Sequence, residues 1–165
     1  CWMNGEYIRN LSTEEFHKLA EPYYRGVITN ENLDVEKISR ILQPRTEILS
    51  TIPKNIDFFD SLPGYDTSIF INKKMKTDKE ISYTSLKAAL PVLEELSEWN
   101  DNTIHCALMD LAEKLGIKKS QLLWPVRIAI TGKAITPGGA IEIADILGKE
   151  ETVKRIKSGI EKLSQ

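Results

Sequence analysis

The sequence is poor in cysteine, in long apolar runs and in net charge. Its 165 residues include two cysteines, Cys1 and Cys106, and neither belongs to a CxxC pair. This excludes a disulfide framework and a cysteine-based zinc site, and it is typical of a reducing cytosol. No apolar run approaches the roughly 20 residues that a membrane helix needs, and no signal-peptide pattern opens the chain. We therefore expect a cytoplasmic protein that does not bind a membrane.

The sequence also lacks a recognisable catalytic or metal-binding constellation. Its two histidines, His17 and His105, are far apart and have no ligand-spaced partner, so we interpret them as surface or hydrogen-bonded core residues. No nucleophile–base pair or phosphate-binding loop supports a stand-alone enzyme. We assign no catalytic residue, metal or cofactor to this chain. Cys106 lies in an apolar helical pattern, which predicts a buried and inert thiol.

A net positive charge, the usual mark of a nucleic-acid binder, is absent. The chain has 22 Lys and Arg against 24 Asp and Glu, a formal charge of −2, which argues mildly against RNA. Phosphate contacts are local, however, so a small basic stripe is enough to bind a nucleic-acid backbone. The basic residues that can form such stripes, or simply lie on solvated faces, are Lys73, Lys74, Lys76, Lys118, Lys119, Lys154, Arg155, Lys157 and Lys162.

Helical periodicity is the pattern that the chain does have. Ser12 followed by Glu15 forms a capping box before an amphipathic stretch, and Asp34 can cap the next helix. Pro44 interrupts that second helix and suits the first turn of a new one, which would carry Arg45. These signals predict several short helices in the first 60 residues.

The second half of the chain repeats the helical pattern after a polar break. Residues 61–76 are rich in turn formers and lysine, so we place a domain boundary near residue 66. Further helices are expected from about Ser82 onward, and Ser120 is expected to cap one of them. Their expected ends are Gly116, Gly132 and Gly148. Strand alternation does not persist anywhere. We predict an all-α fold of two small packed helical subdomains, 1–66 and 67–165.

Three motifs follow one another along the chain. They are Trp2–Arg9, Leu42-Gln43-Pro44-Arg45, and Trp124-Pro125-Val126-Arg127 followed by Ala129–Gly132 and Thr136-Pro137-Gly138. In this order and approximate spacing they resemble the C-terminal, anticodon-binding region of bacterial-type glutamyl-tRNA synthetases, which are class I aminoacyl-tRNA synthetases. The closing Leu147–Glu150 also fits. The resemblance covers essentially the whole chain.

The resemblance implies a helical cage that grips the anticodon loop of glutamate tRNA. In such a ligase a separate Rossmann domain attaches glutamate to tRNA with ATP and Mg²⁺. The signature motifs of that domain are missing here, and Lys74–Thr77 resembles one of them only superficially, so we interpret it as a solvated linker. The chain opens inside an apolar-aromatic segment. We therefore expect a fragment of a monomeric ligase that does not itself catalyse aminoacylation.

Anticodon bases are read by stacking and by hydrogen bonds to their Watson–Crick edges. Glutamate anticodons end in C and glutamine anticodons in G. Because arginine has only donors and cytosine offers two acceptors, a well-placed arginine prefers C, by about 1–3 kcal/mol. The resemblance places Arg45 at this third base and Arg127 at the first base, with the Thr136-Pro137-Gly138 turn beside it. Arg45 therefore favours a parent that discriminates against glutamine tRNA.

Each of these assignments has an alternative in the sequence. Arg45 can be a solvated residue of a helical first turn, and Arg127 can pair with a carboxylate such as Glu142. Lys118 and Lys119 are candidate phosphate contacts or plain surface lysines. A helical module that binds a protein partner instead of tRNA is the alternative for the chain as a whole.

The chain departs from the family's commonest pattern at two positions. Gln43 stands where an arginine is usual, which removes a positive charge near Arg45. Gly139 stands where a larger apolar residue often packs against the anticodon. Trp124, close to Arg127, can stack on a base, but its apolar helical surroundings favour a core position.

Overall fold

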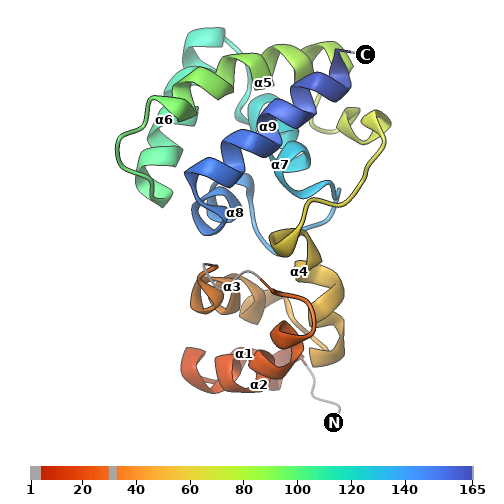
Figure 1. Ribbon diagram of the computed structural model, residues 1–165, viewed down its shortest axis with the longest axis vertical. Coiled ribbons are helices and arrows are strands. Elements are labelled where there is room, and N and C mark those ends of the chain that lie inside the picture. Colours follow the sequence, from red (N-terminus) through yellow and green to blue (C-terminus); the bar gives the residue numbers. More distant parts are fainter. Residues whose placement is uncertain (1–4, 30–32, 165) are drawn as a thin grey trace. The chain divides into compact units, whose positions relative to one another are not determined.

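The computed structural model describes residues 5–29 and 33–164, which form helices joined by loops (Figure 1). Residues 2–4 of the first family motif, Trp2–Arg9, lie outside them. The described residues contain α-helices and short 3₁₀ helices, and their strand-like pairing is limited to an isolated bridge between Asn72 and Thr77. The all-α prediction is confirmed. Residues 1–61 together with 135–138 make one compact unit, and residues 62–134 with 139–165 make the other. The sequence places the boundary a few residues later, at 66.

The first unit is built from short helices, and two of them begin after a capping side chain. Its elements are α1 (Gly5–Asn10), α2 (Thr13–Arg25), α3 (Val35–Leu42), η1 (Gln43–Arg45), η2 (Leu49–Thr51) and α4 (Ile52–Asp60). As predicted, the Ser12 hydroxyl accepts the N–H of Glu15 at 3.1 Å, and Asp34 accepts the N–H of Lys37 at 3.2 Å. Helix α2 packs on both α3 and α4. The fully buried side chains include Phe16, Ile38, Leu42, Ile56, Phe58 and Phe59.

A buried polar network joins α2 to α3. The Ser39 hydroxyl donates to the carbonyl of Val35 at 3.1 Å, which uses its single proton. Tyr24 and the Nδ1 of His17 therefore donate to Ser39, at 2.6 and 2.7 Å. Burial raises the pKa of Tyr24 to about 12, partly offset by the bond to Ser39. His17 is thus a hydrogen-bonded structural residue, one of the two roles that the sequence favours for it.

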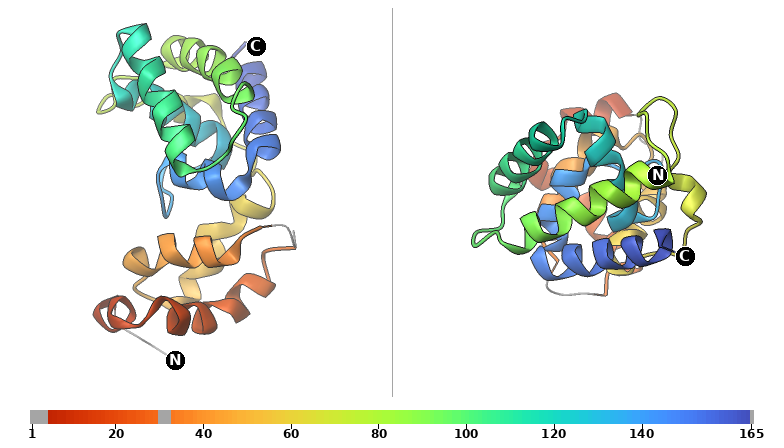
Figure 2. Two further views of the ribbon diagram at one scale, coloured as in Figure 1. Left: turned by 90° about the vertical axis from the view of Figure 1, so that its left-hand side faces the viewer. Right: turned by 90° about the horizontal axis from the view of Figure 1, so that it is seen from above.

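The second unit contains the longer helices. Its elements are η3 (Thr67–Phe70), α5 (Lys79–Glu94), α6 (Asp101–Leu115), α7 (Lys119–Thr131), α8 (Ala140–Leu147) and α9 (Lys149–Leu163). Helices α5 and α9 lie side by side, and α7 packs against both (Figures 1 and 2). Gly159 permits the close approach of α9 to α7, because a Cβ at this position would lie 3.0 Å from the Cβ of Ala129. This arrangement makes α7 the central helix of the unit.

The helix ends of the second unit agree with the sequence better than the helix starts do. Gly116, Gly132 and Gly148 end α6, α7 and α8 with φ values of 67°, 68° and 87°, which glycine adopts without steric cost. The predicted Ser120 cap is wrong. Helix α7 begins at Lys119, two residues earlier than a Ser120 cap would place it, and the Gln121 side chain accepts the backbone N–H of Lys118 at 3.0 Å.

Two other side chains lie where the sequence does not put them. Cys106 is exposed rather than buried, because the buried face of α6 is formed by Ile104, Leu108, Leu111 and Ala112. Arg155, counted among the surface basic residues, is 2% exposed. Its Nη1 donates to the carbonyl of Ile130 at 2.7 Å and its Nε to Glu151 at 2.8 Å. Arg155 therefore ties α9 to α7 and does not face solvent.

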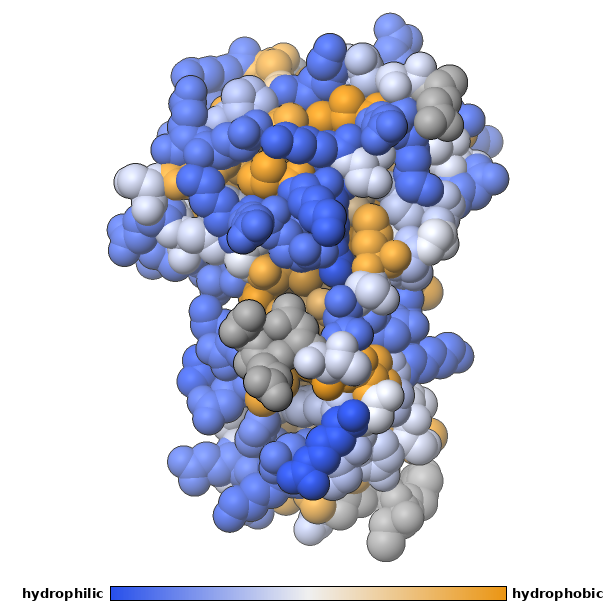
Figure 3. Space-filling model, viewed as in Figure 1, coloured by the Kyte–Doolittle hydropathy of each residue, from blue (hydrophilic) through white to orange (hydrophobic). Residues whose placement is uncertain are grey.

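The surface of each unit is predominantly polar on the face shown in Figure 3, where apolar residues appear in small groups between hydrophilic ones. Within the described ranges, no helix is long and apolar enough to cross a membrane.

Candidate nucleic-acid interface

Arg45 is exposed at the end of a short 3₁₀ turn in the first unit. One of its terminal nitrogens, Nη1, donates to the carbonyl of Ile41 at 2.9 Å, so the side chain covers the end of α3. The expected new α-helix after Pro44 does not form, because the backbone becomes extended at Thr46. The guanidinium has five N–H groups, so this tether leaves donors for a ligand.

Gln43 holds this turn against the end of α1. Its side-chain nitrogen donates to the carbonyls of Ile8 and Leu11 at 3.0 and 2.7 Å. An arginine at this position would bring a charge to the site, whereas the amide here closes two backbone acceptors. The residue that departs from the family pattern therefore has a structural role in orienting the segment that carries Arg45.

Arg127 lies on α7 in the second unit and is held from two sides. Its Cζ lies 4.9 Å from the ring centroid of Trp124, within cation–π range. Its Nη2 donates to the carbonyl of Ala134 at 2.7 Å. Burial lowers the pKa of Arg127 from its usual value, although a guanidinium stays protonated at neutral pH. Glu142, the alternative partner, accepts the backbone N–H of Gly139 instead.

Trp124 is a buried support for Arg127. Its exposed fraction is 9%, and its Nε1 donates to the carbonyl of Ile69 at 3.3 Å. This agrees with the core position that its sequence context favours. A tryptophan and an arginine three residues apart on a helix are neighbours, so the stacked pair could have been anticipated from the sequence.

A proline inside α7 leaves a carbonyl that a neighbouring helix satisfies. Pro125 has no N–H to donate to the carbonyl of Gln121, four residues earlier. The hydroxyl of Ser85 on α5 donates to that carbonyl at 3.3 Å. The proline of the Trp124–Arg127 motif is therefore accommodated by packing on α5.

A hollow of about 320 Å³ adjoins Arg127 in the second unit. Its lining consists of Met75, Ser120, Leu123, Trp124, Arg127, Gly139 and Ala140. Gly139 leaves this hollow without a side chain at that point. Ala134, which binds Arg127, and Gly139, which lines the hollow, are the residues that flank the segment 135–138 on each side.

The turn Thr136-Pro137-Gly138 belongs to the first unit, as Arg45 does. The Thr136 hydroxyl donates to the carbonyl of Gly138 at 2.7 Å, which closes the turn. Ile135, which precedes it, is 89% exposed. Arg127, Lys118 and Lys119 belong to the second unit.

Lys118 and Lys119 are exposed at the start of α7. Lys76, from the turn between Asn72 and Thr77, lies beside Lys118. Its presence lowers the pKa of Lys118, mainly through a hydrogen-bonding contact and to a smaller extent through charge repulsion. Lys76 has a φ of 58°, the sole positive φ at a non-glycine among the described residues. This conformation costs roughly 1–2 kcal/mol for a residue with a Cβ. The sequence had no signal for this pairing.

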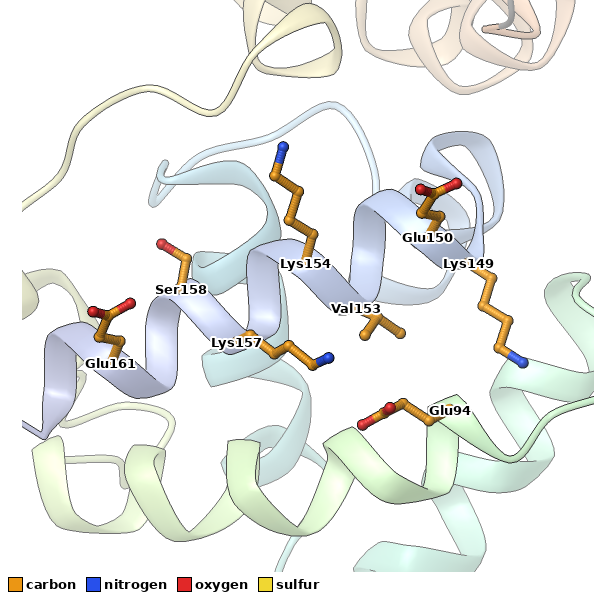
Figure 4. Close-up of a pocket in the computed structure, with 8 residues that line it drawn as sticks. All are labelled: Glu94, Lys149, Glu150, Val153, Lys154, Lys157, Ser158 and Glu161. Atoms are coloured by element: carbon orange, nitrogen blue, oxygen red, sulfur yellow. The ribbon is translucent and has the colours of Figure 1, made fainter.

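The lysines of α9 lie in a different electrostatic setting. A hollow of about 730 Å³ runs along α9 beside α5. Figure 4 shows acidic and basic side chains alternating around it: Glu94, Glu150 and Glu161 with Lys149, Lys154 and Lys157. The ammonium group of Lys149 also donates a hydrogen bond to the carbonyl of Leu96 at 2.6 Å. The balanced charge makes this face a poor phosphate site compared with the start of α7.

Comparison with known proteins supplies the family. The family model described as "Anticodon binding domain" matches residues 15–160. The chain belongs to the anticodon-binding domain family.

Relatives of this anticodon-binding domain and solved structures similar to it include glutamate–tRNA ligases. The chain is 59% identical over 162 residues to a glutamate–tRNA ligase of Clostridium tetani, covering 98% of the chain and 33% of that protein. It is 55% identical over 164 residues to that of Clostridium acetobutylicum, covering 99% of the chain and 34% of that protein. The chain therefore spans about a third of the length of these relatives.

The fold of the domain is likewise found in solved structures. A glutamate tRNA ligase of Elizabethkingia meningosepticum, in complex with its amino acid, superposes with a TM-score of 0.79 at 22% identity over 97% of this chain and 31% of its own. A glutamate–tRNA synthetase from Elizabethkingia anophelis gives 0.72 at 21% identity, over 96% of this chain and 30% of its own. The predicted family resemblance is confirmed.

Proposed function

We propose that this anticodon-binding domain recognises the anticodon loop of glutamate tRNA as part of a glutamate–tRNA ligase. The observation that carries the proposal is the likeness to such ligases along 98–99% of the chain. The geometry of the arginines supports it, since Arg45 and Arg127 each have part of the guanidinium tied to a backbone carbonyl and the remaining donors available.

Arg45 is proposed to read the third anticodon base. Cytosine presents the acceptors O2 and N3, whereas guanine presents donors at N1 and N2. An arginine held by the carbonyl of Ile41 therefore favours C by about 1–3 kcal/mol. On this basis the parent ligase prefers glutamate tRNA to glutamine tRNA.

Arg127 is proposed to read the first anticodon base. The stack on Trp124 and the bond to Ala134 fix the guanidinium before any ligand binds, which lowers the entropy lost on binding. The turn Thr136-Pro137-Gly138 would offer backbone groups beside that base. Lys118 and Lys119 would contact phosphates.

The attachment of glutamate to tRNA is proposed to take place in another part of the parent ligase. ATP and Mg²⁺ would act in its catalytic domain, and no catalytic role is proposed for this chain. A monomeric, cytoplasmic parent is the simplest form of this proposal.

The test is fluorescence-anisotropy binding of the chain to a glutamate anticodon stem-loop and to the same loop with C replaced by G at the third base. Tighter binding of the C form is expected. Equal binding of both forms would keep RNA recognition but contradict discrimination by Arg45. Binding of neither form at low salt would contradict the RNA-binding role and favour a module that binds a protein partner.

A further inference from the structure

Two segments that are far apart in the chain are joined through one glutamine side chain. The Oε1 of Gln121 accepts the backbone N–H of Lys118 at 3.0 Å, and its Nε2 donates to the carbonyl of Lys76 at 3.0 Å. The turn that carries Lys76 is itself closed by two bonds between Asn72 and Thr77, at 3.1 and 3.0 Å. Both lysines are therefore anchored at the backbone on either side of Gln121.

This anchoring holds two positive charges together. The pKa of Lys118 is lowered by the contact with Lys76 and by the repulsion between the two charges. In the described part of the chain, neither lysine forms an ion pair with a carboxylate. Lys76 also keeps the left-handed conformation, at φ 58°, that glycine or asparagine would adopt more easily. An anion between the two ammonium groups would be attracted by both, and these attractions would outweigh the repulsion between the two lysines.

The lysine pair also adjoins the hollow beside Arg127. Met75, next to Lys76, and Ser120, two residues after Lys118, both line that hollow. Lys118 and Arg127 are nine positions apart along α7, which at about 1.5 Å per residue is about 13–14 Å. An RNA strand with a base in the hollow would have phosphate groups a few nucleotides away within reach of the pair.

We propose that Lys76 and Lys118, linked by Gln121, form a single site for one phosphate group of the RNA backbone. This inference rests on the proposed function, and it adds the turn 72–77 to the RNA-binding surface. It assigns the pair to positioning of the strand rather than to reading of a base, because phosphate contacts carry no sequence information.

The test compares Lys76→Asn, Lys118→Gln and the double variant in binding to the glutamate anticodon stem-loop at several salt concentrations. Each single variant should lose affinity on the order of tenfold. The slope of log affinity against log salt concentration, here called the salt slope, should fall by about 1 in magnitude. The double variant should bind about as weakly as either single one, because one phosphate contact is lost in all three. The matched control is Lys154→Gln, which makes the same change in charge at an exposed lysine of α9. This variant should bind the stem-loop nearly as tightly as the unsubstituted chain does.

Folding is controlled by the choice of asparagine at position 76, which tolerates positive φ. Lys76→Asn should therefore unfold at the same or a higher denaturant concentration while it binds RNA less tightly. Unchanged affinity in both single variants would overturn the site together with the phosphate contact proposed for Lys118, and would leave recognition of the anticodon loop standing. Fully additive losses in the double variant would overturn the shared site alone.

A second probe separates this site from the proposed function. Inorganic pyrophosphate, titrated into the ¹⁵N-labelled chain, should shift the amide signals of Lys76, Lys118 and Gln121. The same signals should shift equally in the Lys154→Gln variant, which keeps the lysine pair. If pyrophosphate shifts these signals and no stem-loop binds, the assignment to RNA is overturned together with the proposed function. If stem-loops bind and pyrophosphate shifts none of these signals, only the lysine-pair site is overturned.

Discussion

Arg45 and Arg127 differ in how strongly the protein holds them. Arg45 is exposed and has one bond to the carbonyl of Ile41, whereas Arg127 is stacked on Trp124 and bonded to Ala134. A side chain that is already fixed loses less entropy on binding. We therefore expect Arg127 to contribute mainly through its fixed position and Arg45 through the donors that it directs at a base.

The substitution Arg45→Ala should cost about 1–3 kcal/mol of stem-loop binding and remove the preference for C over G at the third base. Arg40→Ala, which removes another exposed arginine from α3, is the matched control and should keep the preference. Anisotropy titrations with the two loops measure both quantities. An intact preference in Arg45→Ala would remove Arg45 from the reading role.

Two tyrosines provide a contrast in buried hydroxyl groups. The hydroxyl of Tyr24 is bonded to Ser39 at 2.6 Å, whereas that of Tyr65 is buried with no hydrogen-bond partner in the described part of the chain. Tyr24→Phe should lower the free energy of unfolding by about 1 kcal/mol. Tyr65→Phe should leave it unchanged or raise it, because it removes an unsatisfied polar group. Urea unfolding at pH 7 measures both, and an equal loss in the two variants would contradict the assignment.

The same tyrosines predict how stability depends on alkaline pH. Burial raises the pKa of both to about 12 from the usual value of 10. The folded state therefore retains the phenolic protons more strongly than the unfolded state. Their contribution to stability is complete below pH 10 and is lost as the pH rises toward 12. Each phenylalanine variant should show a smaller fall in unfolding free energy between pH 9 and pH 11.5 than the parent chain does, and an identical fall would contradict the shifts.

Helix α7 depends on α5 for one backbone acceptor. Ser85→Ala would leave the carbonyl of Gln121 without the donor that compensates for Pro125, and should cost about 1 kcal/mol of stability. Ser82, buried on the same helix, has a hydroxyl without a partner in the described residues. Ser82→Ala should therefore be neutral or slightly stabilising. Thermal unfolding of the two variants measures the difference, and a greater loss for Ser82→Ala would refute this account of the proline.

The glycines that end α6 and α7 are expected to differ in their tolerance of a side chain. Gly116 and Gly132 have similar positive φ values, so either alanine variant should cost about 1–2 kcal/mol. A Cβ at Gly116 meets nothing within 4 Å, but at Gly132 it would lie 3.0 Å from Tyr65 and 3.1 Å from the carbonyl of Pro63. Gly132→Ala should lose about 1–3 kcal/mol more. Denaturant midpoints measure this, and equal losses would mean that Tyr65 moves freely.

Local signals in the sequence predict most helix boundaries, and non-local contacts account for the failures. Ser12, Asp34 and Gly116 act within a single turn of their own helix, so the sequence suffices for them. The start of α7 depends on Gln121, whose other bond goes to Lys76, 45 positions away. Whether a residue such as Arg155 faces solvent or a neighbouring helix depends on packing that periodicity alone does not reveal.

The whole chain carries a net charge of −2, so its affinity for RNA must come from where the basic residues lie. Lys119→Ala should weaken binding of the C-form and G-form stem-loops alike and lower the salt slope by about 1. Binding measured between about 50 and 200 mM salt gives the slope. A loss confined to one of the two loops would show that Lys119 contacts a base instead of a phosphate.

At the scale of the molecule, the family motifs predict the class of protein but not its division into units. The sequence places Thr136-Pro137-Gly138 beside Arg127, in the second subdomain. The structure assigns this turn to the first unit, together with Arg45. Such membership is decided by contacts between distant segments, and composition and turn signals carry no information about them.

The chain passes from one unit to the other after residues 61, 134 and 138. Neither unit is therefore a continuous stretch of sequence, and a single cut cannot separate them: the piece that starts at residue 62 retains Ile135–Gly138, and the piece that ends at 61 lacks them. Truncation after residue 61 will therefore yield an incomplete first unit. An insertion or deletion between 134 and 139 will likewise alter the first unit while leaving residues 1–61 unchanged, so the two units cannot be exchanged between relatives as independent modules.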